Sequence, residues 1–565
     1  MLSVVVIGLL IAPMIVTSRP YASDWSNNLW LVWEQGLNIR TLGHPSYFVQ
    51  SGIGAFFPQY LFYGGTLFSA VGFLATVSGE HPLAAYVFTY IVAIVGAYAG
   101  WLWICRQLGL SQWRAHVPAI LYVTSSYYVT NIYGRGDFGE TVSTSAIPLV
   151  VACAVYLVRA RRWRVTHLAV FVIAVVLFTG SHPLTLVWGT TFLALLGLAL
   201  SSAWRVAGVK WRRVAAVGGV GVAGLGVNSW VLIPTLAYHN RILHGTDTAI
   251  SQLWYSTPGV LFGVLRDTVD PSWITGDVQA QAPVLAIAWA LVVVAATWRV
   301  VPGPIKRAAV GLIALLALLI WLVLSPGVLG ALPKPWNNLQ FPFRLVIYVT
   351  LAGCGLVTCA LLMLQRAPVR RRHWAEMALV LVALVSVTLA TRQVWHTPSF
   401  YFKDRTEVFS SAVNPPSSYY SGADFADSSA PVVKPTISQL VGGTPLVARP
   451  AVELPASPFN ATYRYPIVVS QEGTVATNVT AGPYLVTVSG AVPVGRTPLE
   501  PGGAYGRSVM VVRITGKPGE HKTLSFSTTS SRALRLGMVG TFASLLVLAL
   551  VLVGVFVRGR RSAPA

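Results

Sequence analysis

The stretch TVSTSAIPLVVACAVYLVRARRWRVTHLAVFVIAVVLFTGS, residues 141–181, decides the fold class of this chain. It holds two apolar runs, at 141–158 and 166–181, and a short loop between them that carries four arginines. Lipid offers no partners for backbone N–H and C=O groups, so apolar runs of this length in a bilayer must be helical. The stretch therefore predicts two transmembrane helices joined by a basic loop.

The composition of the whole chain fits this pattern. Hydrophobic residues make up 54% of the 565 residues and charged residues only 10%, and the mean hydropathy is +0.63. A soluble domain has about 25% charged residues. Most of the chain is therefore predicted to lie in lipid.

The net charge of +22 comes from short loops between apolar runs. These loops carry Arg159, Arg161, Arg162 and Arg164; Arg205, Lys210, Arg212 and Arg213; Arg299, Lys306 and Arg307; Arg366, Arg370, Arg371 and Arg372; and Arg558, Arg560 and Arg561. This is the positive-inside pattern of membrane proteins, and it also suits an anionic leaflet. Because no soluble basic face exists, nucleic-acid binding is excluded.

With the basic loops in the cytoplasm, twelve spans with both termini inside are predicted. They lie near 1–17, 84–104, 117–131, 141–158, 166–181, 184–203, 214–236, 281–298, 308–325, 345–364, 375–391 and 534–557. Residues 1–391 form the transmembrane domain, 18–83 its first outer loop, and 558–565 a basic cytoplasmic tail. The preference for Arg over Lys, with abundant Ala and Val, is typical of GC-rich bacteria, so the predicted location is a bacterial cytoplasmic membrane.

The apolar stretch 56–77 does not fit this count. It is either a re-entrant or interfacial helix, or a span whose inclusion would place the N-terminus outside. Its interior Pro58, Gln59, Gly64 and Gly65 favour the first alternative.

Residues 392–533 change in character, with Ser, Thr, Pro, Gly and Val dominant. Alternating segments at Tyr463–Val469, Tyr484–Ser489 and Ser508–Thr515, separated by Gly/Pro turns, predict strands. The block predicts an extracytoplasmic, β-rich, sandwich-like domain before the last helix. Seventeen of the eighteen acidic residues fall in outer loops or in this block, and Glu376 alone falls on the cytoplasmic side.

Two further patterns are assigned structural roles. The four cysteines, Cys105, Cys153, Cys354 and Cys359, lie in or beside apolar runs, so neither disulfides nor a metal cluster are expected. Gly219-Val-Gly221-Val-Ala-Gly224 matches a dinucleotide-binding pattern but lies within a predicted span with no preceding strand. Close helix packing by small residues explains it better.

The first outer loop contains Asp24, followed by Glu34-Gln-Gly36. A carboxylate just outside the first helix lies where an interfacial active site needs a general base. Capping of the next helix is the structural alternative.

The second outer loop reads Tyr133-Gly-Arg135-Gly-Asp137-Phe-Gly-Glu140. Ionisable groups held at the membrane surface tend to be paired or functional. Arg135 either binds a phosphate through two parallel hydrogen bonds or neutralises Asp137.

Two other outer segments carry candidate residues. His182 lies at the outer end of a span, as a catalytic group or a helix-end hydrogen-bonding residue. Arg344, preceded by Gln340, enters a span from outside, either to bind a polyprenyl phosphate or to snorkel to lipid headgroups.

Several segments together resemble YfhO-like proteins and membrane proteins related to 6-pyruvoyl-tetrahydropterin synthase. They are Asp24 with Glu34-Gln-Gly36, Ser51-Gly-Ile-Gly54, Phe57-Pro-Gln-Tyr60-Leu-Phe-Tyr63, Gly134 to Glu140 with Pro148-Leu149, Ser181-His182-Pro183, Leu339-Gln340-Phe-Pro-Phe-Arg344, and Val511 to His521 before the closing helix. Both groups are similar to the GT-C superfamily of integral membrane glycosyltransferases, and nothing in the residues suggests pterin chemistry.

The resemblance implies a polyprenyl-phosphate sugar donor and inverting transfer to a glycan, lipid or protein acceptor on the extracytoplasmic face. It also implies interfacial helices after the first span and a first-loop carboxylate, Asp24, as general base. Arg135, Gln340 and Arg344 then become candidates for the donor phosphate. Asp137, Glu140 and His182 become candidates for sugar or acceptor, and Glu34 is a further candidate for substrate binding.

One departure from the GT-C pattern concerns metal. Asp24 is followed by Trp25 rather than by a second acidic residue. No metal ligand is therefore assigned, no cofactor is required, and a divalent metal stays an open alternative.

Two rival functions use the same residues. A lipid or glycolipid transporter would need ionisable groups deep in several spans, and the predicted spans are almost free of charge. A non-catalytic envelope assembly factor would bind a partner through the exported domain.

Overall fold

The computed structural model describes most of the chain. The described residues are 2–16, 24–47, 49–51, 54–57, 59–79, 81–206, 208–238, 257–264, 278–339, 341–396, 451–453, 462–469, 472–480, 486–498, 508–528 and 531–560.

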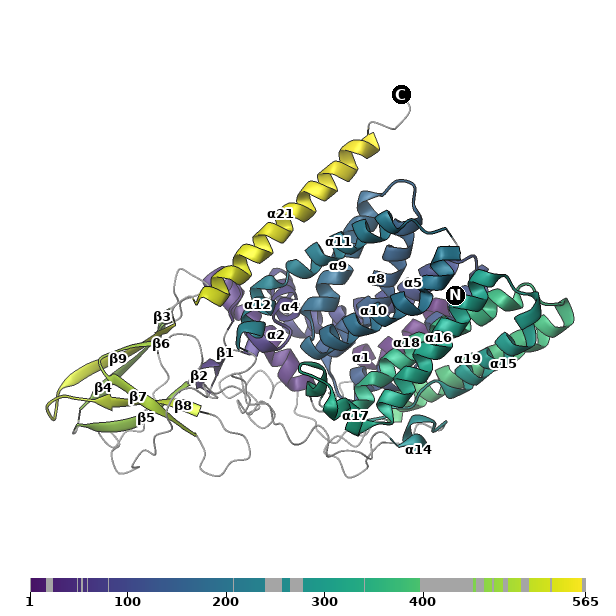
Figure 1. Cartoon of the computed structure of the whole chain (residues 1–565). Coiled ribbons are helices and arrows are strands. Elements are labelled where there is room, and N and C mark those ends of the chain that lie inside the picture. The colour runs from purple at the N-terminus through teal and green to yellow at the C-terminus, as the bar shows by residue number, and fades with distance from the viewer. Residues whose placement is uncertain are drawn as a thin grey trace.

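The described chain is mostly helical, and its helices form a bundle (Figure 1). The helices before residue 165 are α1 (Leu2–Val16), α2 (Trp25–Leu42), α3 (Gln59–Phe62), α4 (Gly65–Val77), α5 (Pro82–Gln107), α6 (Gln112–Val123), α7 (Ser126–Val129), the π-helical turn η1 (Thr130–Gly134) and α8 (Phe138–Arg159). Those after it are α9 (Val165–Gly180), α10 (Pro183–Val206), α11 (Trp211–Gly226), α12 (Ser229–Tyr238), α14 (Pro258–Leu261), α15 (Val284–Thr297), η4 (Trp298–Val300), α16 (Gly303–Val323), α17 (Pro326–Ala331), η5 (Trp336–Asn338), η6 (Pro342–Leu345), α18 (Val346–Leu364), α19 (Val369–His396) and α21 (Arg532–Arg560).

Seven of the described helices are long and apolar enough to cross a bilayer: α5, α8, α10, α16, α18 with the turn before it, α19 and α21. The pair α11 and α12, bent by 73° at a short break, makes an eighth if it is one span. The chain is therefore a polytopic α-helical membrane protein, as its composition predicts.

The predicted count of twelve spans stays a prediction. Three predicted spans coincide with shorter apolar helices, α1, α9 and α15. A fourth, at 117–131, is divided between α6, α7 and η1.

The stretch 56–77 is not one continuous helix. It passes through α3, turns at Gly64 with φ +61°, and continues as α4. With thirteen residues, α4 rises about 20 Å, which is less than the roughly 30 Å hydrocarbon core of a bilayer. This length favours the re-entrant or interfacial alternative.

Basic loops gather at one end of the bundle, named the basic end and made of residues 106–114, 159–164, 205–213 and 366–376. There Arg159 donates to the carbonyl of Gln107 at 2.7 Å, and Arg213 to that of Ala160 at 2.8 Å. Guanidinium groups thus bind the unpaired carbonyls at the ends of α5 and α8, as the helix dipole favours.

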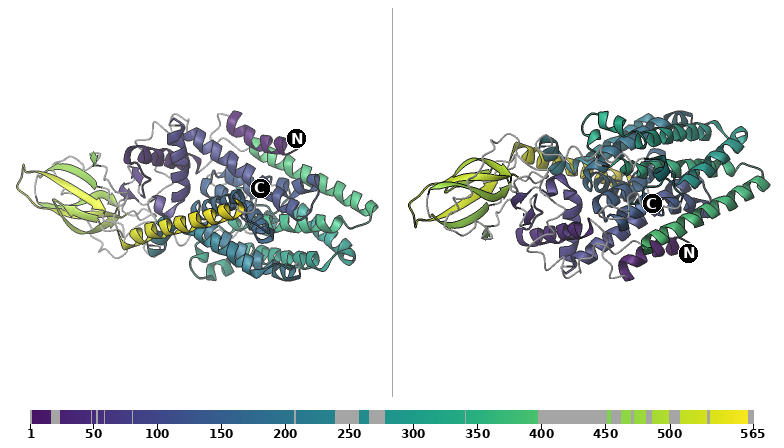
Figure 2. Two further views of the ribbon diagram at one scale, coloured as in Figure 1. Left: turned by 90° about the horizontal axis from the view of Figure 1, so that it is seen from above. Right: turned by 90° about the horizontal axis from the view of Figure 1, so that it is seen from below.

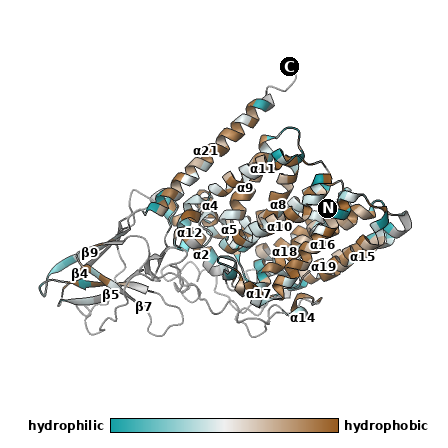
Figure 3. Cartoon of the chain, viewed as in Figure 1, coloured by the Kyte–Doolittle hydropathy of each residue, from teal (hydrophilic) through white to brown (hydrophobic). Residues whose placement is uncertain are grey.

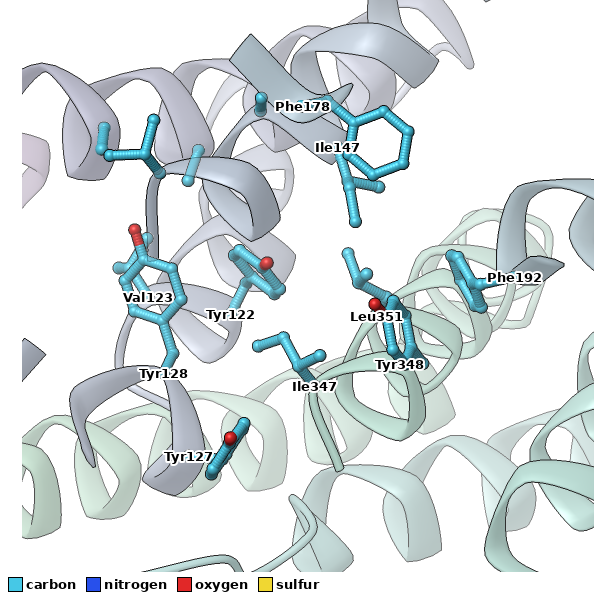
Figure 4. Close-up of a cluster of buried hydrophobic side chains, with 14 of the residues drawn as sticks. Tyr122, Val123, Tyr127, Tyr128, Ile147, Phe178, Phe192, Ile347, Tyr348 and Leu351 are labelled. Atoms are coloured by element: carbon cyan, nitrogen blue, oxygen red, sulfur yellow. The ribbon is translucent and has the colours of Figure 1, made fainter. Parts of the chain in front are cut away.

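The core of the bundle lies around α18. In its most apolar stretch 89% of the residues are buried. Figure 4 shows Ile347, Tyr348 and Leu351 of α18 among Tyr122, Tyr127 and other buried side chains from α6 to α10. Glycines allow close packing: a Cβ on Gly100 of α5 would lie 2.7 Å from the backbone of α8. All four cysteines are buried and free.

The described strands after residue 450 form two sheets with a hairpin from the first loop (Figures 1 and 2). The strands are β1 (Val49–Ser51), β2 (Gly54–Phe57), β3 (Ala451–Glu453), β4 (Thr462–Val468), β5 (Gly473–Thr480), β6 (Val486–Ser489), β7 (Val492–Pro498), β8 (Ser508–Ile514) and β9 (His521–Thr528). One sheet has the order β1-β2-β5-β8-β7, and the other β3-β4-β9-β6.

Strands β4, β6 and β8 lie at the three segments whose alternation predicts strands. The pairing of the first loop with the later strands has no counterpart in the sequence analysis: β2 runs parallel to β5, with Ala55 opposite Val479. The boundaries of the predicted domain at 392–533 remain a prediction, since 397–450 lie outside the described residues.

Helix α21 leads back from the strands along the bundle. Its first turns pack against α12, while only 6% of its most apolar stretch is buried. Hydrophobic residues cover this exposed part (Figure 3). An apolar helix with so little protein around it is suited to contact lipid.

Candidate active site

Ionisable side chains from four segments meet at the end of the bundle opposite the basic end, here named the site end. The segments are the start of α2, the chain from α7 to the start of α8, the turn between α9 and α10, and η6. Helices α8 and α10 both begin at the site end and finish with a basic residue in their last turn, Arg159 and Arg205.

Arg135 lies at the centre of this group. Its Nη2 donates to Asp137 Oδ2 at 2.9 Å, and its Nη1 faces Glu140 Oε2 at 3.2 Å. Nη1 also lies 3.0 Å from the Tyr127 hydroxyl and 3.2 Å from Asn131 Oδ1. One guanidinium therefore pairs with two carboxylates. Of the two roles considered for Arg135, neutralisation of Asp137 is the one that the structure shows.

A π-helical turn places Arg135. The turn is held by the Thr130 hydroxyl, which accepts from the Gln393 side chain at 2.8 Å and lies 3.1 Å from the Gln279 backbone N–H. Such turns are often found at functional sites. Gly136, with φ +69°, then reverses the chain, so that Asp137 caps α8 by accepting from the Glu140 N–H at 3.0 Å.

Arg344 reaches the same carboxylates from η6. Its Nη1 lies 3.2 Å from Glu140 Oε2 and its Nη2 4.0 Å from Asp137 Oδ2. The residue is only 7% exposed. Arg344 therefore points into the protein, and the snorkelling alternative does not describe it.

His182 completes the group. Its Nε2 lies 3.3 Å from Arg344 Nη1, and its Nδ1 2.8 Å from the Thr185 hydroxyl. Because a guanidinium only donates, Nε2 acts as acceptor toward Arg344, and Nδ1 accepts from the Thr185 backbone N–H at 3.2 Å. Burial lowers the pKa of His182, in keeping with a neutral ring.

The charges of this buried set balance. Two guanidiniums face two carboxylates, and their side chains are only 1–8% exposed. Burial by itself would raise the pKa of Asp137, but the opposing effects of the Arg135 and Arg344 guanidiniums are larger and lower it. Asp137 is therefore ionised at neutral pH, and Arg135 is held charged because the surrounding acids raise its pKa despite burial.

Asp24 lies beside this set. Its backbone N–H donates to the Arg135 carbonyl at 2.8 Å, and one turn later Asn28 Nδ2 donates to the Gly136 carbonyl at 2.9 Å. Asp24 is half-buried, and its side chain makes no capping hydrogen bond to the first turn of α2. The Asp24 side chain therefore does not cap α2. The position of Asp24 suits a residue at the edge of a site.

Two further candidates from the sequence remain, Glu34 and Gln340. Glu34 is buried within the first-loop helices, where its Oε2 accepts from the Tyr60 hydroxyl at 2.9 Å. Gln340 lies outside the described residues.

Three neighbours of the group are not among the candidates identified from the sequence. Tyr127 donates to Glu140 Oε1 at 2.8 Å, Asn131 accepts from Arg135, and the Tyr63 hydroxyl lies 3.4 Å from Asp137 Oδ1. Tyr127 and Asn131 are polar residues inside an apolar run, a signal that could have identified them. Tyr63 belongs to a segment that carries the family resemblance, but it is assigned no role there.

The same residues can be tested as metal ligands. Asp137, Glu140 and His182 each offer an atom, and these atoms lie within 4.8 Å of one another. Both carboxylates, however, already contact guanidinium groups. A divalent cation would have to displace Arg135 or Arg344 against their charge, so the arrangement as it stands does not fit a metal ion.

The glycine pattern at 219–224 lies inside α11. A Cβ on Gly224 would lie 3.0 Å from the Val175 side chain of α9. The pattern thus serves close helix packing.

No protein-family model matches the chain, and no curated protein is similar to it in sequence. A solved structure, the arabinofuranosyltransferase AftD from Mycobacteria, is 19% identical with a TM-score of 0.41. The match covers 70% of this chain but only 27% of AftD, so this chain spans about a quarter of that protein's length.

Proposed function

We propose that this chain is a GT-C-type membrane glycosyltransferase, which moves a sugar from a polyprenyl-phosphate donor to an extracytoplasmic glycan, lipid or protein acceptor. One observation carries the proposal: six ionisable residues from four distant segments converge at the site end, namely Asp24, Arg135, Asp137, Glu140, His182 and Arg344. The family resemblance of these segments supplies the reaction class, by analogy.

In the proposed reaction Asp24 is the general base. Its carboxylate takes the proton of an acceptor hydroxyl as that oxygen attacks the anomeric carbon of the donor. The bond from the anomeric carbon to the phosphate oxygen breaks on the opposite face, and its electron pair leaves with the phosphate. The configuration at the anomeric carbon is thereby inverted.

The developing charge on the phosphate needs fixed positive groups. Both arginines lie 3.2 Å from Glu140, but Arg344 lies 4.0 Å from Asp137 where Arg135 lies at 2.9 Å, so we assign this role mainly to the more loosely held Arg344. Gln340 is proposed to assist it. In this scheme guanidiniums supply the positive charge, and no step depends on a metal.

Asp137, Glu140 and His182 are proposed to accept hydrogen bonds from hydroxyls of the sugar or acceptor. All three are at most 3% exposed, so substrate must enter by displacing a neighbour. We propose that Tyr63 is the neighbour that moves. It follows α3 in the first loop and contacts both Asp137 and the His182 ring.

The proposed location is a bacterial cytoplasmic membrane, with both termini inside and the site and strands outside. Two exposed serines allow a test, Ser78 after α4 and Ser202 near the basic end. The native cysteines are buried, so a membrane-impermeant maleimide applied to intact cells should label Ser78→Cys and spare Ser202→Cys. Labelling of Ser202→Cys alone would place the site in the cytoplasm and refute the proposal.

The chemistry is tested in proteoliposomes with a panel of radiolabelled polyprenyl-phosphate sugars and envelope glycan acceptors. We expect Asp24→Asn to lower transfer by about 10²–10⁴-fold while the protein still inserts. Glu376→Gln is the matched control, because it removes a carboxylate at the basic end.

The outcomes separate the alternatives. No transfer by the wild type with any donor would refute the enzyme proposal, and unchanged transfer by Asp24→Asn would refute the base assignment. An assembly factor would be indifferent to Asp24→Asn in a growth assay of an envelope mutant. The transporter alternative receives no support, because the ionisable groups described here lie at the two ends of the bundle.

A further inference from the structure

Helices α11 and α12 meet at a short break, where the chain is bent by 73°. Such a break releases backbone groups from the helical pattern, and lipid cannot bind them. Another part of the protein must therefore provide their hydrogen bonds.

The side chain of Thr541, on α21, provides two of them. Its hydroxyl accepts from the Trp230 backbone N–H at 2.9 Å and donates to the Val227 carbonyl at 3.0 Å. Small residues let α21 come this close: a Cβ on Gly537 would lie 2.8 Å from the Ser229 carbonyl oxygen, and one on Gly540 2.9 Å from the Ser229 side chain. The first turns of α21 thus complete the broken helix.

Within the break, Asn228 connects it to two other segments. This residue is fully buried. Its Nδ2 donates to the Thr179 hydroxyl at 2.7 Å and to the Val176 carbonyl at 3.0 Å, both on α9. Its Oδ1 accepts from the Thr66 hydroxyl of α4 at 2.7 Å.

Both segments lead directly into the candidate site. Thr179 is followed by Gly180, Ser181 and His182, and Thr66 is preceded by Gly65, Gly64 and Tyr63. The two turns touch, since a Cβ on Gly64 would lie 2.5 Å from the Ser181 carbonyl oxygen. The Tyr63 and His182 rings then meet edge to face, with centroids 5.7 Å apart.

We propose that Asn228 and Thr541 are positioning residues, which hold the turns carrying His182 and Tyr63 at the site through the broken helix. By this inference α21 is part of the machinery of the site as well as a membrane anchor. The inference deepens the proposed function and rests on it for its catalytic meaning, but the structural coupling can be measured without any substrate.

The test is hydrogen–deuterium exchange with mass spectrometry on the full chain in nanodiscs. Thr541→Val keeps the shape of the side chain and removes the hydroxyl that serves both backbone groups. We expect exchange in peptides covering 60–68 and 178–186 to rise about five- to tenfold, the equivalent of one lost buried hydrogen bond. Thr541→Ser restores the hydroxyl and should restore protection.

The matched control is Thr190→Val, because the Thr190 hydroxyl is exposed and bonds only to the preceding turn of its own helix. Faster exchange confined to 225–232 and 537–545, with both site peptides as in the wild type, would overturn the inference. Failure of Thr541→Ser to restore protection would overturn it as well.

The transfer assay keeps this result separate from the proposed function. If the wild type transfers sugar, Thr541→Val should lower kcat and Thr541→Ser should recover it. If the wild type transfers none while the exchange pattern appears, the coupling stands and the enzyme proposal fails.

Discussion

Two groups of charges lie at opposite ends of the same apolar bundle. At the site end Arg135 and Arg344 face Asp137 and Glu140, with side chains 1–8% exposed. At the basic end Glu376 accepts from Arg114 at 2.6 Å and lies 3.6 Å from Arg372, with side chains 12–30% exposed. The residue types are the same, but the first group is buried more deeply than the second.

Burial changes what an ion pair contributes to stability. A buried charge that loses its partner costs several kcal/mol, whereas an exposed pair contributes about 1 kcal/mol or less. The site end should therefore be intolerant of change, and the basic end tolerant.

The largest expected effect is at Arg135. Arg135→Met leaves Asp137 and Glu140 with Arg344 as their remaining cation, and we expect a loss of about 3–5 kcal/mol in the free energy of unfolding. SDS titration of the protein in mixed micelles measures this quantity. The charge-balanced double variant Arg135→Met/Glu140→Gln should recover part of the loss. A single variant within 1 kcal/mol of the wild type would contradict the comparison.

A smaller effect is expected at Tyr127. Tyr127→Phe removes the hydroxyl that donates to Glu140 and lies against Arg135, at a cost of about 1–3 kcal/mol in the same titration. The neighbouring Tyr128→Phe is the control, because that hydroxyl pairs with the neutral Ser145. Equal losses of unfolding free energy in the two variants would mean that a hydrogen bond to the charged residues of the site stabilises the protein no more than one to a neutral residue.

The smallest effect is expected at Glu376. Glu376→Gln breaks the group at the basic end, and we expect a loss of roughly 1 kcal/mol or less, which 1 M salt should reduce further. A loss as large as that of Arg135→Met would remove the distinction between the two ends.

Much of the membrane architecture can be predicted from the sequence, because lipid imposes long apolar runs and arginines mark the loops of one side. Strands β4, β6 and β8 can also be predicted, because apolar and polar residues alternate along their segments. The count of spans is harder. Helices α9 and α15 are short, α11 and α12 are bent, and a run of apolar residues does not reveal either property.

The candidate residues that the sequence identifies are those with charge in otherwise apolar surroundings. Asp24, Arg135, Asp137, Glu140, His182 and Arg344 are all recognisable in this way, and they converge. What could not be predicted is their pairing: Arg135 could hold a phosphate or a carboxylate, and only the fold decides which is near. The separation of Glu34 from the group also depends on the fold.

The neutral polar residues were beyond prediction for a different reason. Asn228 and Thr541 act through hydrogen bonds to elements far away in the chain. No local pattern distinguishes such a residue from an ordinary polar side chain within an apolar run.

The parallel pairing of β2 with β5 has a consequence for biosynthesis. Ala55 and its partner Val479 are more than 400 residues apart. At 5–20 residues per second, the nascent first loop leaves the ribosome roughly 20–80 s before its partner strand exists. During that interval the β1–β2 hairpin presents an open edge, a known starting point for aggregation. Because Thr541 is translated later still, polypeptides that end before Val479 lack both contacts and keep this edge open.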